Sequence, residues 1–187
     1  MRIALLAPLP PEKNGIADYA NHFKTALEQL GVEVATPLTG VVGSTASIKQ
    51  AIAGFDWQGV DLVHAELGGG RLGEFLALRE LRKAYPALPL TATVHDPERM
   101  VWRREQLPFP LNLLESLPSP LPQAAVVLAD PLTLREERHV AQGLTRLVTL
   151  TRLGADCLTA RMQLPVGKVA VINHANLDIP PVALPPL

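Results

Sequence analysis

Residues 1–31, MRIALLAPLPPEKNGIADYANHFKTALEQLG, contain one complete strand, loop and helix. An apolar run at 2–8 leads into a proline-rich loop, after which apolar side chains recur every three or four positions as far as Leu30. A short apolar strand followed by an amphipathic helix is typical of a parallel sheet whose strands are joined by helices. Asn14 is placed to cap the start of this helix, and Gly31 to end it in a left-handed conformation.

The rest of the chain continues this alternation of strands and helices. Further strands are predicted at 32–38, 60–66, 90–96, 146–151 and 168–174, and further helices at 71–85 and 153–162. The expected fold class is therefore α/β: a Rossmann-like, open, mostly parallel sheet with helices on both faces. We expect one such domain over residues 1–176.

Three segments depart from the regular alternation. Residues 107–122 are dense in proline and cannot form one continuous helix, so we expect a long loop with short helical pieces. Periodicity alone does not decide whether 123–144 contain a strand or a buried helix, and we favour a helix. Residues 177–187 are rich in proline and lack core periodicity, so we interpret them as a linker toward a C-terminal domain.

Composition argues against several classes of partner and location. The 187 residues are 48% apolar and carry a formal net charge of -1, which gives no electrostatic footprint for nucleic acid. Peripheral membrane contact is equally unsupported, because no predicted helix is strongly basic. Cys157 is the single cysteine, so neither an internal disulfide nor a zinc site built from several cysteines can form. A reducing compartment is expected, and the cytoplasm is the simplest location.

The first candidate site residue is Gly15, at the start of the first helix. Unpaired N–H groups and the helix dipole favour an anion there, and a residue without a side chain lets a phosphate approach the backbone. An ordinary loop glycine is the competing interpretation, and the local sequence alone favours it. The chain contains neither GxGxxG nor GxxxxGK[ST], so an ordinary dinucleotide site or P-loop is not supported.

His95 and Asp96 follow the fourth predicted strand, where ligands bind in open parallel sheets. The histidine could hydrogen-bond a sugar hydroxyl or a developing negative charge, or it could simply be satisfied by a backbone carbonyl. With His64 and Glu66, which share one face of the third strand, the pair could also form the metal site of a hydrolase. No further ligand cluster supports that third interpretation, and we expect no metal.

Three segments carry a resemblance to a known family: APLPPEKNGIADYANHFKTAL (7–27), TVHDPERMVWR (93–103) and LVTLTRLGADCLTARMQLPVGKVAVINHANLD (147–178). They resemble the amino-terminal half of retaining glycosyltransferases of the GT-B fold that use nucleotide sugars. This large family includes many bacterial mannosyl- and glucosyltransferases. The likeness spans almost the whole chain.

The resemblance implies a role for each candidate residue. The backbone of Gly15, with Asn14 and Ile16 beside it, would approach the diphosphate of the donor, and His95 would contact the transferred sugar. The acceptor side would be lined by Asp18, Tyr19, Asp96 and Arg99. The nucleotide sugar would be a substrate, so the resemblance implies no cofactor.

The family also has a C-terminal domain that grips the donor nucleotide and carries basic and acidic catalytic residues, and no part of this sequence resembles that domain. The resemblance therefore implies an acceptor-binding domain that transfers little or no sugar by itself. Its expected partners are a nucleotide sugar, a carbohydrate or glycolipid acceptor, and that second domain. The alternative is a stand-alone binding or scaffolding domain that keeps the fold without catalysis.

Overall fold

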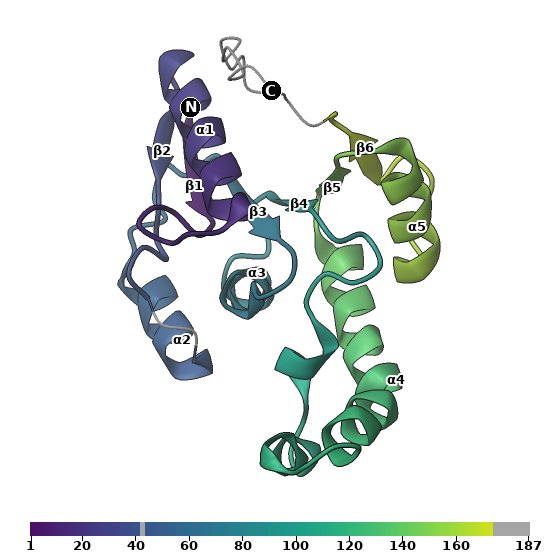
Figure 1. Ribbon diagram of the computed structural model, residues 1–187. Helices are drawn as coiled ribbons and strands as arrows, with labels where there is room; N and C mark the ends of the chain where they lie inside the picture. Colours follow the sequence, from purple (N-terminus) through teal and green to yellow (C-terminus); the bar gives the residue numbers. More distant parts are fainter. Residues whose placement is uncertain (42–43, 174–187) are drawn as a thin grey trace, which may run out of the picture.

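The computed structural model describes residues 1–41 and 44–173. They form an α/β fold around a sheet of six strands, all parallel, in the order β2-β1-β3-β4-β5-β6 (Figure 1). The strands are β1 (Arg2–Leu6), β2 (Glu33–Ala35), β3 (Leu62–Leu67), β4 (Leu90–Val94), β5 (Arg146–Thr149) and β6 (Val169–Val171). The predicted Rossmann-like open sheet is confirmed, although most strands are shorter than the segments predicted for them.

The helices are α1 (Gly15–Gln29), α2 (Thr45–Gly54), α3 (Leu72–Ala84), α4 (Leu121–Gly143) and α5 (Arg152–Met162). The helical interpretation of 123–144 is therefore confirmed. Our sequence reasoning missed α2, which is short and begins with a capping box between Ser44 and Ser47. The usual signature of such a box has Glu or Gln three residues after the capping Ser or Thr. A serine stands there in this chain, so the sequence gave no signal.

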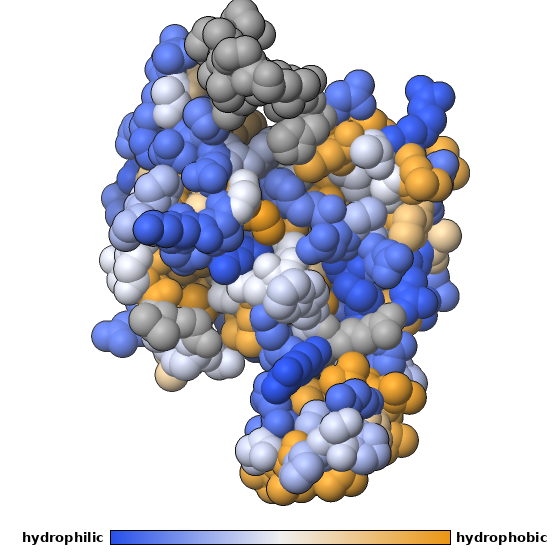
Figure 2. Space-filling model, in the orientation of Figure 1, coloured by the Kyte–Doolittle hydropathy of each residue, from blue (hydrophilic) through white to orange (hydrophobic). Residues whose placement is uncertain are grey.

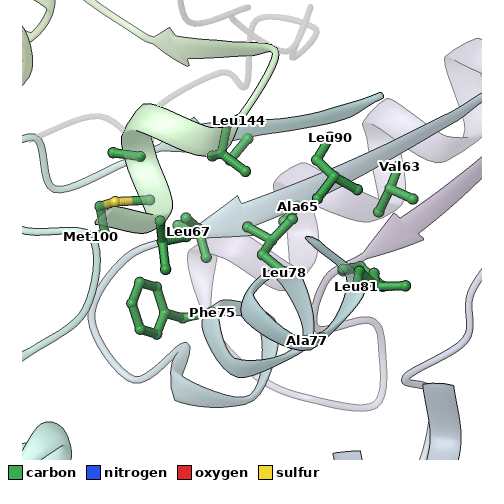
Figure 3. Packing of buried hydrophobic residues seen from close by; sticks show 14 of the residues in the cluster. Val63, Ala65, Leu67, Phe75, Ala77, Leu78, Leu81, Leu90, Met100 and Leu144 are labelled. Carbon is green, nitrogen blue, oxygen red and sulfur yellow. The ribbon is translucent and has the colours of Figure 1, made fainter. Parts of the chain in front are cut away.

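Helices cover the two faces of the sheet unequally. On one face, α2, α3, α4 and α5 share a large core with the strands (Figure 1). Figure 3 shows part of this core, in which Phe75 and Leu78 of α3 belong to the same cluster as Leu67 of β3. On the other face, Ala20 of α1 packs with Leu5 of β1 in a separate small cluster. Most of the apolar core thus lies on the face that α1 does not cover.

Side chains of β3 differ sharply between these two faces. Val63, Ala65 and Leu67 belong to the large core, and they alternate with His64 and Glu66. Successive side chains of a strand point to opposite faces, so the two polar residues lie on the face of α1. The residues paired with them on β4 are both threonines, at positions 91 and 93. The fold therefore places a polar strip under α1.

The proline-rich segment forms two short 3₁₀ helices, η1 (Arg103–Gln106) and η2 (Leu111–Ser116), as expected for a loop with helical pieces. With the first turns of α4, this segment makes a lobe that projects from the sheet (Figure 1). Hydrophobic surface gathers on this lobe (Figure 2), where Phe109, Val127 and Leu128 are exposed. In the described part of the chain, no helix combines the length and hydropathy needed to cross a bilayer.

The strand order locates the expected binding edge. The chain moves from β1 to β2 in one direction and from β3 onward in the other, so the order reverses between β1 and β3. Ligands of open α/β sheets bind at such a reversal, outside the carboxyl ends of the strands. The loops that follow β1 and β3 meet at that edge, and those after β4 and β5 lie beside them.

Candidate functional site

A hollow of about 430 Å³ opens at this edge of the sheet. It brings together most of the predicted site residues and four further ones. The predicted residues in its lining are Asn14, Gly15, Ile16, Tyr19, His95 and Asp96, and the additional ones are Gly69, Arg71, Trp102 and Leu150. Segments that are far apart in the sequence therefore converge on one concave surface.

The start of α1 forms one wall of the hollow. Asn14 caps the helix as predicted, because its side-chain Oδ1 accepts a hydrogen bond of 2.8 Å from the N–H of Ala17. No residue of the described chain accepts a hydrogen bond from the N–H groups of Gly15 and Ile16. A Cβ atom added to Gly15 would meet nothing within 4 Å. Two backbone donors without an acceptor in the described chain thus lie at the positive end of a helix dipole, and there is open space beside Gly15.

We expect Asn14→Ala to lower the free energy of unfolding by about 1 kcal/mol, because the N–H of Ala17 loses its side-chain acceptor. Urea denaturation of the variant and of the unmodified chain measures this loss. Asn14→Ser is the matched control, since a serine caps equally well and adds no charge beside Glu12, which accepts from the Asn14 amide at 3.1 Å. Equal stability of the alanine variant and the unmodified chain would show that the cap contributes nothing.

His95 lies just after the carboxyl end of β4 and forms a hydrogen bond with Glu66 of β3. Its Nε2 atom lies 2.8 Å from Oε2 of the glutamate, which is completely buried. The backbone N–H of His95 donates to the carbonyl oxygen of Leu67, so the β3–β4 pairing continues to this residue. Tyr19 of α1 meets the imidazole edge-on, with ring centroids 5.1 Å apart. The position of this histidine is therefore fixed from three sides.

His64 extends the same polar strip one step further from the hollow. Its Nδ1 lies 2.8 Å from the hydroxyl of Thr91, and its Nε2 lies 3.0 Å from the hydroxyl of Thr93 and 3.3 Å from Oε1 of Glu66. Burial alone would raise the pKa of Glu66, but hydrogen bonding and positive charge from His64 and His95 outweigh it and lower that pKa. The carboxylate form of Glu66 is therefore the favoured one.

The pKa of Tyr19, which lies beside His95, shifts in the opposite direction to that of Glu66. Burial, and secondly the negative charge of Glu66, raise the pKa of its hydroxyl. The phenol therefore remains neutral at physiological pH and does not act as an anionic base.

Three glycines, at 68–70, follow β3, and the middle one packs closely against other residues, which limits what this loop can bind. The N–H of Gly69 donates to Oδ2 of Asp96 at 2.7 Å, so this donor is already used. A Cβ atom on Gly69 would lie 2.1 Å from the ring of Trp102, which covers the loop. The glycines here allow close packing of an aromatic ring on the backbone. Gly69 and Trp102 lie far apart in the sequence, so the contact between them gave no local signal.

Arg71 supplies positive charge between this hollow and a second one. Its Nη1 lies 3.0 Å from Glu12 and 3.6 Å from Glu74. The second hollow, also of about 430 Å³, lies on the other side of the β1–α1 loop and is lined by the same three residues. Burial raises the pKa of Glu74, against the opposing effect of Arg71. The sequence pattern marks Arg71 only as the start of a predicted helix and indicates no role in a site.

The structure does not bring every predicted residue to the hollow. Arg99 is 6% exposed, and its guanidinium binds Glu137, Asp130 and Thr133 of α4, so it holds the loop rather than a ligand. Asp18 is exposed in the first turn of α1, where it lines a neighbouring hollow. The 177–187 linker lies outside the described residues.

The hydrolase interpretation required His64, Glu66, His95 and Asp96 to surround a metal. Within residues 1–41 and 44–173, no group of three or more His, Cys, Asp or Glu side chains is placed to hold a metal ion. Glu66 instead lies between the two histidines, with a hydrogen bond to His95, and Asp96 accepts from the N–H of Gly69. The site therefore has the features of a polar binding surface beside a helix N-terminus.

Comparison with known proteins adds little to this geometry. No family model matches the chain, and no curated protein matches it. One solved structure that is similar is an ABC transporter system solute-binding protein from Conexibacter woesei DSM 14684, at 15% sequence identity and a TM-score of 0.37. The similarity covers 88% of this chain and 69% of that chain. A likeness this distant carries no argument about function.

Proposed function

We propose that this chain is the acceptor-side domain of a retaining glycosyltransferase that uses a nucleotide sugar. The observation that supports it most directly is the shared hollow at the strand reversal. There, His95 lines the same hollow as Gly15 and Ile16, whose N–H groups have no acceptor among the described residues. A donor diphosphate and its sugar need these two kinds of contact side by side.

The proposed chemistry depends on position and charge. The acceptor hydroxyl oxygen bonds to the anomeric carbon of the sugar, the bond from that carbon to the diphosphate breaks, and the hydroxyl proton leaves with the diphosphate. Negative charge grows on the departing diphosphate, and the positive end of α1 stabilises it there. His95 positions the sugar, since a misplacement of about 1 Å costs about a hundredfold in rate.

This role requires a second domain that binds the nucleotide. In the proposal, that domain closes over the hollow from the strand-end side, and the acceptor is a carbohydrate or glycolipid that enters beside Tyr19 and Asp96. The proposed location is the cytoplasm, where nucleotide sugars are made. The chain alone is expected to bind donors weakly and to transfer little or no sugar.

Donor binding tests the proposal, with Gly15→Val as the variant. Saturation-transfer NMR of the chain with UDP-glucose and GDP-mannose should show binding, and the valine should weaken it at least about tenfold, because its side chain fills the space that the phosphate enters. Gly54→Val is the control, since a Cβ there also meets open space but lies at the end of α2.

Two results would count against the proposal. Binding that survives Gly15→Val would remove the diphosphate from the start of α1. A chain that binds a carbohydrate but none of the nucleotide sugars would favour the alternative, a stand-alone binding domain without catalysis.

A further inference from the structure

The geometry points to Glu66 as a positioning residue that fixes which nitrogen of His95 carries the proton, so that the imidazole offers an acceptor to the hollow and selects a hydroxyl group rather than an anion. This inference rests on the proposed function for the identity of the ligand as a sugar. The contact itself stands on the described residues alone. Nothing in the sequence pattern linked Glu66 to His95 in this way.

The first step concerns the proton on Nε2 of His95. This atom lies 2.8 Å from Oε2 of Glu66, and a carboxylate oxygen can only accept. The proton must therefore lie on Nε2. In the neutral imidazole the other nitrogen, Nδ1, then carries a lone pair and can only accept.

The second step concerns the carboxylate, which is itself held in place. Glu66 is fully buried, and its second oxygen faces Nε2 of His64 at 3.3 Å. The hydroxyl of Thr91 donates to the carbonyl oxygen of Val63 at 3.1 Å, so its oxygen accepts from Nδ1 of His64. Each oxygen of the carboxylate thus lies beside one imidazole, and the hydrogen bond to His95 comes from Oε2.

The third step concerns Nδ1, the other ring nitrogen of His95, whose side chain lines the hollow. None of the residues in 1–41 and 44–173 forms a hydrogen bond with its Nδ1, although the side chain is only 13% exposed. A lone pair with a buried carboxylate behind it repels a phosphate or carboxylate and attracts a hydroxyl proton. The N–H groups of Gly15 and Ile16, in the same hollow, attract the anion instead. The two walls therefore select different parts of one ligand.

The tautomer can be measured without any ligand, by long-range proton–nitrogen NMR correlation on the uniformly ¹⁵N-labelled chain. At about pH 8, where an ordinary imidazole is neutral, we expect His95 to carry its proton on Nε2. In Glu66→Gln the side-chain amide can donate to Nε2, so the proton should shift toward Nδ1. The exposed His22 and His139 serve as references in the same spectra and should not change.

Circular dichroism first establishes that Glu66→Gln is folded. Should it not be, Glu66→Asp gives a second test: the shorter carboxylate is expected to lose the contact and leave His95 as a mixture of tautomers. A proton on Nδ1 in the unmodified chain, or an unchanged tautomer in both variants, would overturn the inference. A changed tautomer in a chain that binds no nucleotide sugar would leave Glu66 as a positioning residue and count against the proposed function alone.

Discussion

Glu137→Ala is expected to lower the free energy of unfolding by about 3–5 kcal/mol, because it leaves the charge of Arg99 without its main partner in the interior. Oε1 of Glu137 accepts from Nε of Arg99 at 2.8 Å and from Gln106 at 2.8 Å, while Oε2 accepts from the N–H of Met100 at 2.8 Å. The carboxylate is completely buried. It therefore ties the whole loop after β4 to α4.

Urea denaturation measures the effect, and Arg104→Ala is the matched control. Arg104 pairs with Glu115 at 3.0 Å, but both side chains are largely exposed, so losing that pair should cost less than about 1 kcal/mol. A loss at Glu137 as small as that at Arg104 would mean that the loop does not depend on the buried pair.

The second large effect is expected for His95→Ala in a two-domain form of the enzyme. Sugar transfer should fall about a hundredfold, because the imidazole that positions the sugar is lost. The comparison is of kcat/KM for the variant with that of the unmodified enzyme and of His139→Ala, which removes an exposed histidine of α4. Transfer that persists unchanged in His95→Ala would remove this histidine from the reaction.

Sequence reasoning was most successful where local signals agree. The first strand, the Asn14 cap and the end of α1 at Gly31, whose φ is 78°, all appear as predicted. Each of them depends on neighbours a few residues away. The helix α2 was missed because its capping box uses two serines, at 44 and 47, and because it is only 10 residues long.

The site was predicted in part, for a physical reason. Strand-end residues such as Gly15 and His95 can be placed from the sequence, because the carboxyl ends of parallel strands share one edge of a sheet. Contacts across the sheet depend on register and side-chain direction. Arg99 follows β4 in the same loop as Asp96, yet it turns toward Glu137, which lies 38 positions further along.

The contact of Glu66 with His95 also crosses the sheet, so it could not be predicted from the sequence. Its relation to His64 on the same strand face followed from their spacing of two residues, and this suggested a metal site. Its hydrogen bond to His95, 29 positions away, required the register of β3 against β4. That contact is the basis of the positioning role proposed for Glu66.

The most direct test of the proposed function is an assay of sugar transfer and donor hydrolysis with a panel of nucleotide sugars. It compares the 187-residue chain alone with the same chain joined to a C-terminal, donor-binding domain of the GT-B type. We predict activity in the joined form and little or none in the chain alone. A joined form that is folded but neither transfers nor hydrolyses any donor would contradict the proposed function.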